Sequence, residues 1–132
     1  MAFESKHRFA RIAPRKARLV MDLVRGRDVD DAISMLKFSK KRAAVFVEKV
    51  IRSAVANANE QSAAPVRNTL YVAQAWVDPG PIIKRFQPKD RGKAYPINKR
   101  TSHLVVTVDE REEGASAPKM TSIGRRQGKA RR

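Results

Sequence analysis

Positive charge is distributed very unevenly along this chain, and this limits where a folded core can lie. Residues 1–27 carry eight Lys and Arg against two acids, residues 79–103 carry seven against one, and residues 114–132 carry six with no acid. Residues 28–78 carry seven against six. Because uncompensated like charges repel and destabilise a compact state, we expect a nearly neutral folded body with cationic extensions that bind a polyanion.

Overall composition narrows the partners and the chemistry further. The net charge of +16 and a pI near 11.1 favour nucleic acid or an anionic membrane as the partner. There is no cysteine, which excludes disulfides, thiolate catalysis and cysteine-based zinc sites. The longest uncharged run, Asn68–Val77, spans ten residues, whereas a membrane helix needs roughly 18. The N-terminal sequence lacks the apolar core of a signal peptide, so we expect a cytoplasmic protein without a membrane segment.

The N-terminal third of the chain is predicted to form a strand and two helices. Alternation over residues 3–11 predicts a half-buried strand with Phe3, Ser5, His7 and Phe9 on one side. Helical spacing then begins near Pro14, which suits the first position of a helix, and Gly26 is placed to end it. Asp28 is placed to cap a second short helix.

A long helix and two strands are predicted to complete the body. Ser39 is placed to cap a helix over about residues 40–59, where apolar residues recur at three and four. Residues 69–77 and 101–109 have strand composition. In the last strand we expect the inward side chains to be Leu104, Val106 and Val108, and the outward ones to be Ser102 with Thr107 or His103.

Three strands are too few for a sandwich, so the helices must cover one face of a small antiparallel sheet. We therefore predict an α+β fold in which three helices pack on a three-stranded antiparallel sheet, with a long protruding β-hairpin and a basic C-terminal tail. Residues 1–111 are expected to form one globular domain that includes the hairpin. Residues 112–132 are expected to be a disordered basic extension.

The segment over residues 79–100 is the most informative part of the sequence. Two apolar patches, one at Ile82, Ile83 and Phe86 and the other at Tyr95 and Ile97, flank a polar centre at Asp90-Arg91-Gly92. This arrangement predicts a hairpin with its turn near Gly92. A solvated surface loop is the alternative, but structureless loops of this length are uncommon in compact domains. We expect the hairpin to be mobile when free and ordered by an anionic partner.

Catalytic and metal-binding patterns are weak in this sequence. The acids at residues 28–31 suit a helix N-terminus. Those at residues 109–113 have the composition to bind Mg²⁺, but a solvated acidic turn explains them more simply. The run Gly124–Lys129 is one residue short of a phosphate-binding loop and lacks its Ser or Thr. We therefore expect no enzymatic activity, no cofactor and no metal.

Several segments, in order, are similar to one known family. They are the runs Lys6–Arg11, Pro14–Val20, Ser53–Ala58, Val77–Pro81 and Lys99–His103, within a match over about residues 5–109. These runs resemble the bacterial-type large-subunit ribosomal protein twenty-two family. The resemblance implies a structural constituent of the large subunit whose body binds large-subunit rRNA and supports subunit assembly. It also implies that the hairpin lines the nascent-polypeptide exit tunnel near the site of macrolide antibiotics. Ile83-Lys84-Arg85 matches the hairpin segment that is associated with macrolide sensitivity in that family.

The residues expected to act fall into two overlapping sets. We expect contacts with rRNA from Lys6, Arg8, Arg11, Arg15, Lys16, Arg18, Arg25, Lys84, Arg85, Lys89, Arg91, Lys93, Lys99, Arg100, His103, Arg125 and Arg126. The tunnel-lining set is Ile83, Lys84, Arg85, Lys89, Asp90, Arg91, Gly92 and Lys93. Expected partners are rRNA, neighbouring large-subunit proteins and the nascent polypeptide, with no homo-oligomer.

Two other functions fit parts of the sequence. A free-standing DNA-packaging or nucleic-acid chaperone protein would wrap a basic arm around duplex DNA. A small nuclease would use Asp109 and Glu110 with Mg²⁺. For the tail, basic filler is the alternative to a segment that threads between RNA helices.

Overall fold

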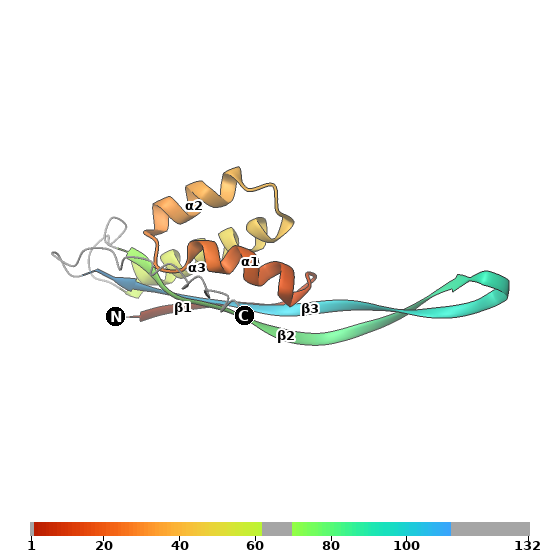
Figure 1. The fold of residues 1–132 in the computed structure, drawn as a ribbon. Helices are drawn as coiled ribbons and strands as arrows, with labels where there is room; N and C mark the ends of the chain where they lie inside the picture. The colour runs from red at the N-terminus through yellow and green to blue at the C-terminus, as the bar shows by residue number, and fades with distance from the viewer. Residues whose placement is uncertain (1, 62–69, 112–132) are drawn as a thin grey trace, which may run out of the picture.

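The part of the chain that the structure describes has an α+β fold with three helices and one three-stranded sheet (Figure 1). The computed structural model describes residues 2–61 and 70–111. In chain order the elements are β1 (Ala2–Ala10), α1 (Pro14–Val24), α2 (Val29–Phe38), α3 (Arg42–Gln61), β2 (Leu70–Lys89) and β3 (Lys93–Glu110), with a 3₁₀ turn at Asp90–Gly92. This confirms the predicted fold class and the predicted order of elements.

Strand β3 is the central strand of an antiparallel sheet with the order β1-β3-β2. Phe3 and Val72 both lie opposite Val108 of β3, one on each side. Strands β2 and β3 continue past the body and stay paired as far as Lys89 and Lys93. They are 20 and 18 residues long, about twice the predicted length, and this pairing is compatible with the hairpin expected over residues 79–100.

The helices cover one face of the sheet and form the core with it (Figure 1). Alternate residues of the strands point into this core, including Phe3, Val106 and Val108. Helix α3 contacts β1 and β3 with a face rich in alanine, because small side chains allow the helix to approach the strands closely. The largest fully buried side chain is that of Met21 on α1. The hydrophobic core therefore lies entirely within the body, at one end of the long hairpin.

Three local predictions are wrong. Ser39 ends α2 and does not cap α3, which begins at Arg42; the Ser39 hydroxyl accepts a 3.4 Å hydrogen bond from the Lys41 N–H. Ser102 is fully buried because it shares a face with Leu104. Phe9 is 59% exposed because a bulge between His7 and Ala10 turns it outward.

The basic extension at residues 112–132 lies outside the described residues, and so does the connection at residues 62–69. No helix in the described ranges is long and apolar enough to cross a membrane.

Candidate nucleic-acid interface

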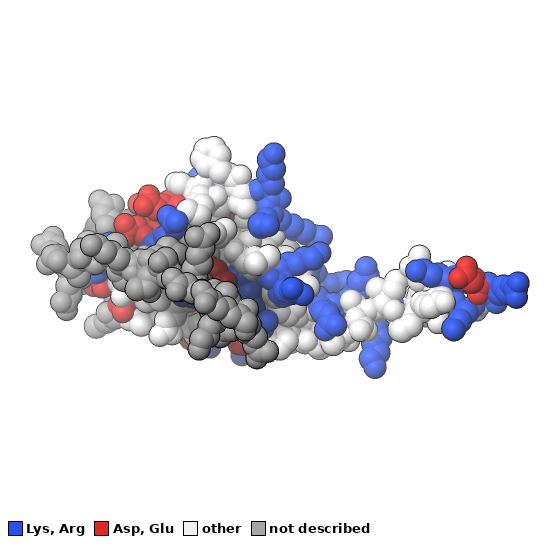
Figure 2. All heavy atoms as spheres, viewed as in Figure 1, with Lys and Arg blue, Asp and Glu red and all other residues white. Residues whose placement is uncertain are grey.

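Lys and Arg side chains gather at one end of the molecule (Figure 2). They cover the hairpin and the adjoining end of the body, whereas the acids of the body gather toward α2. The helix N-termini show the same division. The first turn of α2 contains Asp30 and Asp31, which the helix dipole stabilises, but the first turns of α1 and α3 contain no acid. The end of the body beside the hairpin is therefore electropositive in both side-chain charge and helix dipoles.

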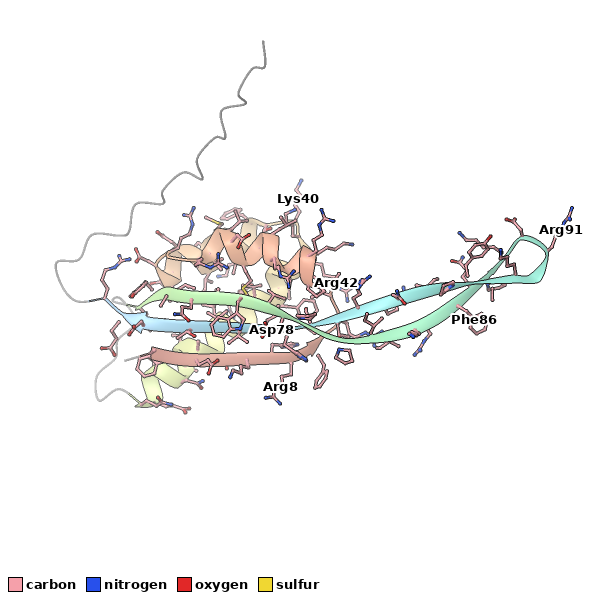
Figure 3. The ribbon with its side chains drawn as sticks, turned by 60° about the horizontal axis from the view of Figure 1, so that its bottom comes forward. Arg8, Lys40, Arg42, Asp78, Phe86 and Arg91 are labelled. Atoms are coloured by element: carbon pink, nitrogen blue, oxygen red, sulfur yellow. The ribbon has the colours of Figure 1, made fainter. Side chains whose placement is uncertain are left out.

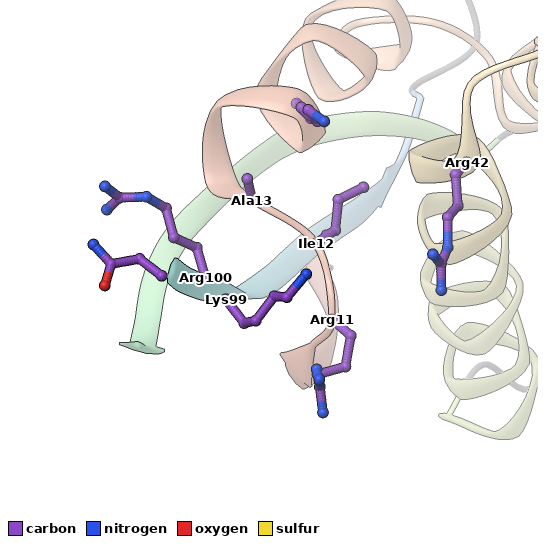
Figure 4. Close-up of a pocket in the computed structure, with 8 residues that line it drawn as sticks. Arg11, Ile12, Ala13, Arg42, Lys99 and Arg100 are labelled. Carbon is purple, nitrogen blue, oxygen red and sulfur yellow. The ribbon is translucent and has the colours of Figure 1, made fainter. Parts of the chain in front are cut away.

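A cleft of about 700 Å³ lies where the hairpin leaves the body (Figure 4). The connection from β1 to α1, the first turns of α1 and α3, and the returning strand β3 form its walls. Its lining contains no acid and five cations, which we call the cationic cleft: Arg11, Lys16, Arg42, Lys99 and Arg100. Within the described part of the chain, none of these five is in an ion pair. Such a lining fits the phosphate groups of a polyanion.

The hairpin extends this cationic surface away from the body. Of residues 81–100, only Ile83 and Ile97 are even half-buried, so backbone pairing between β2 and β3 holds the hairpin together. Lys89 and Lys93 lie directly opposite each other, an arrangement of like charges that destabilises a strand pair. The Tyr95 ring partly offsets this repulsion, because the two ammonium groups lie 5.5 and 5.7 Å from its centroid.

The tip of the hairpin presents an arginine on a constrained backbone. Arg91 and Gly92 both have positive φ, of 50° and 78°, the pattern of a tight hairpin turn. Gly92 adopts this conformation readily, whereas Arg91 does so at a cost of about 1 kcal/mol or more. The Arg91 side chain extends beyond the turn, and Phe86 projects from β2 (Figure 3). The tip is therefore an exposed polar turn that presents Arg91 away from the body.

A Pro-Gly-Pro sequence sets the geometry at the junction of hairpin and body. The pairing register shifts between Pro79 and Ile82, and the Thr101 hydroxyl donates a 2.6 Å hydrogen bond to the Pro81 carbonyl. A Cβ on Gly80 would lie 2.5 Å from the Thr101 Oγ1 and 3.3 Å from its backbone. Only glycine therefore allows β2 to approach β3 this closely.

Most of the predicted rRNA-binding residues occupy three places in the structure. Arg11, Lys16, Lys99 and Arg100 meet in the cationic cleft, and Arg15 lies exposed on the adjoining turn of α1. The hairpin set of Lys84, Arg85, Lys89, Arg91 and Lys93 is exposed throughout. Lys6, Arg8 and His103 lie together on the sheet. Arg125 and Arg126 lie outside the described residues.

Two of the predicted arginines, Arg18 and Arg25, connect α1 to the sheet. The Arg18 guanidinium donates a 3.2 Å hydrogen bond to the Val77 carbonyl, and the Arg25 guanidinium donates to the Ala75 carbonyl at 2.6 and 3.2 Å. Both carbonyls belong to β2, which is an edge strand of the sheet in the described residues. These arginines therefore fix α1 to the edge of the sheet.

Arg42 is a residue of the cationic cleft that the charge pattern did not predict. It was counted with the neutral middle of the chain, but the fold brings it to the cationic cleft, with its guanidinium 6.0 Å from the Phe46 ring centroid. The run Lys40-Lys41-Arg42 at a helix start was a signal that could have identified it. Within residues 2–61 and 70–111, no group of three or more His, Asp or Glu side chains is arranged to hold a metal ion.

Comparison with known proteins agrees with this arrangement. The family model described as "Ribosomal protein L22p/L17e" matches residues 5–109. Proteins named "Large ribosomal subunit protein uL22" from Lacticaseibacillus casei (strain BL23) and Lacticaseibacillus paracasei (strain ATCC 334) are each 52% identical over 102 residues, which is 77% of this chain and 86% of each relative. The match includes the body and the whole hairpin, so the chain belongs to the ribosomal protein L22p/L17e family.

Proposed function

We propose that this chain binds large-subunit rRNA through the cationic cleft and the hairpin, and thereby supports assembly of the subunit. As a member of its family, the chain is a structural protein of the large ribosomal subunit, and we propose no enzymatic activity for it. Its proposed partners are rRNA and the neighbouring proteins of the subunit in the cytoplasmic ribosome. We also propose that it is present there as a single copy.

One observation carries the rRNA-binding proposal: the five cations of the cleft continue directly into the exposed cations of the hairpin. Phosphate contacts of Lys and Arg supply most of the affinity of such interfaces through counterion release. The forked guanidinium groups of Arg11, Arg42 and Arg100 also suit bidentate phosphate contacts. The sites named in the sequence analysis fit this role, with Arg42 added to them.

We propose further that the hairpin lines the nascent-polypeptide exit tunnel. From Pro79 to Lys89 the strand reaches roughly 35 Å, at about 3.3 Å per residue. The proposed lining runs from Ile83-Lys84-Arg85 to the turn at residues 89–93, which would contact the nascent polypeptide. The exposed side chains of the hairpin support this role. Because they make few contacts within the protein, they are available to contact RNA and the nascent polypeptide.

A shortened hairpin tests the proposal. Ile82 and Arg100 are cross-strand partners, so an Asn-Gly turn that replaces residues 83–99 should close the sheet at its base. Because the core lies in the body, we expect the melting temperature of the truncated protein to change little. We expect its incorporation into large subunits to fall and the macrolide response of assembled subunits to change.

A control of full length separates the effect of the hairpin's charge from the effect of its length. In this control Lys84, Arg85, Lys89, Arg91 and Lys93 are all changed to Gln, and the hairpin keeps its length. We expect weaker rRNA binding at raised salt but a tunnel that keeps its shape. Unchanged incorporation, subunit composition and drug response in the truncated protein would show that the hairpin has neither function.

A further inference from the structure

The face of the sheet opposite the helices carries a second surface with different chemistry. A hollow of about 370 Å³ lies there, within the roughly 300–1,000 Å³ typical of ligand sites. We call it the sheet hollow; its floor is Val105, and around it lie Lys6, Arg8, Phe9, Trp76, Asp78 and His103. Arg8 and Asp78 come from the two edge strands (Figure 3).

The strand register builds this surface in rows. Lys6 and Trp76 both lie opposite Val105, one on each side, and Asp78 lies opposite His103 in the next row. Residues two apart on a strand share a face, so Trp76 and Asp78 point away from the core that holds Ala75 and Val77. The single tryptophan of the chain is therefore 37% exposed beside a carboxylate.

The bulge in β1 adds a second aromatic ring to the hollow. Phe9 has a φ of 57°, a backbone conformation that bulky residues rarely adopt and that is found mainly at functional sites. Its N–H donates a 3.0 Å hydrogen bond to the His103 Nδ1, and the two rings meet edge to face at 4.8 Å. Because the His103 Nδ1 is an acceptor, the proton of the neutral ring lies on Nε2.

These groups match a nucleobase better than a phosphate. Trp76 and Phe9 offer aromatic surface on which a base can stack, as single-stranded RNA sites do. The Asp78 carboxylate would repel a phosphate, but it accepts hydrogen bonds from the exocyclic amino group of a base. Lys6, which also pairs with Glu4 at 2.9 Å, and Arg8 can meet the flanking phosphates.

We propose that the sheet hollow binds an unpaired RNA base that carries an exocyclic amino group. This inference rests on the proposed rRNA-binding function and assigns a second site to it. The cationic cleft then holds the RNA backbone, and the sheet hollow holds one extruded base. Uracil should bind less well, because it has no amino group to donate to Asp78.

The test uses the intrinsic fluorescence of Trp76 in the full chain. Hexamers of cytidine, adenosine and uridine ribonucleotides are titrated at fixed salt, and we expect saturable quenching that is stronger with cytidine and adenosine than with uridine. Asp78→Asn should narrow that difference, because an amide also donates hydrogen bonds. Trp76→Leu, measured by anisotropy of a labelled cytidine hexamer, should weaken binding about five- to a hundred-fold, from the value of a stacked base.

Two further variants control for correct folding and for nonspecific RNA binding to exposed aromatic side chains. Phe9→Gly keeps the positive φ of the bulge while removing the ring, so it should fold normally and lose part of the affinity. Phe38→Ala removes an aromatic side chain that is 90% exposed on α2, outside the hollow, and should change nothing.

The results separate this site from the function on which it rests. Hexamer binding with a steep salt dependence, no change in Trp76 emission and no effect of Trp76→Leu would overturn the base site and leave rRNA binding intact. Equal quenching by cytidine, adenosine and uridine hexamers, unaffected by Asp78→Asn, would also overturn it. If neither the hexamers nor large-subunit rRNA bind the chain, both proposals fail.

Discussion

Removing two charges from the cationic cleft should change the salt dependence of RNA binding by a predictable amount. The variant is Arg42→Gln with Lys99→Gln, which takes one residue from α3 and one from β3. If each cleft cation neutralises one phosphate, the slope of log K against log salt becomes less steep by about 1.4 for single-stranded RNA and about 1.8 for a duplex. Between 50 and 200 mM salt, the affinity gap between wild type and variant should therefore narrow about seven- to twelve-fold.

The assay is filter binding or anisotropy with a large-subunit rRNA fragment at four or more salt concentrations. Lys37→Gln with Lys49→Gln is the matched control, because both residues are exposed on helices and neither lines the cleft. It removes the same net charge and should leave the slope nearly unchanged. An unchanged slope in the cleft variant, or an equal change in the control, would refute the cleft as the phosphate site. The cleft variant should also melt no lower than wild type, because it relieves repulsion in the free protein.

Three smaller perturbations test the framework of this interface. Gly80→Ala places a Cβ against Thr101 and should lower the free energy of unfolding by about 1–3 kcal/mol, because the Thr101 hydrogen bond is lost. Chemical denaturation measures this loss, and adding Thr101→Ala should restore part of it. At Gly92 a Cβ would meet open space, but the φ of 78° is unfavourable for alanine. Gly92→Ala should therefore lower the free energy of opening at the tip by about 1–2 kcal/mol, measured by faster hydrogen exchange there, and leave the melting temperature of the body unchanged. Met21→Ala should cost about 2–5 kcal/mol in thermal unfolding, because the side chain is fully buried in the core.

The body could be predicted from sequence because local signals there agree with the tertiary packing. Pro14 does begin α1, and Gly26 does adopt a positive φ just after the helix ends. The prediction that Ser39 caps the long helix was wrong because a serine can hydrogen-bond to backbone groups on either side of it. Only packing decides which helix it adjoins. The prediction that Phe9 shares a face with Phe3 was wrong because a bulge shifts the alternation of side chains by one residue. No feature of the amino-acid composition marks that shift.

The site was harder to predict, since it is made of segments that are distant in sequence. Arg11 lies in the connection from β1 to α1, Arg42 on α3 and Lys99 on β3, and they meet only because α1 and α3 begin at the same end of the sheet. Conversely, Arg18 and Arg25 have the same composition signal as their neighbours but bond to carbonyls of β2. Charge counts identify a cationic region, but they do not separate arginines that hold the fold from those that face a partner.

This division between fold and partner explains why the hairpin tolerates unfavourable features. A like-charged pair such as Lys89 and Lys93 would weaken the core if it lay within the body. On the hairpin it destabilises only the local strand pairing, because no residue beyond Pro81 on β2 is buried. An anionic partner that neutralises these charges then contributes to order in the hairpin. We therefore expect binding of such a partner to be coupled to order in the hairpin, and the body, which contains the core, to fold without it.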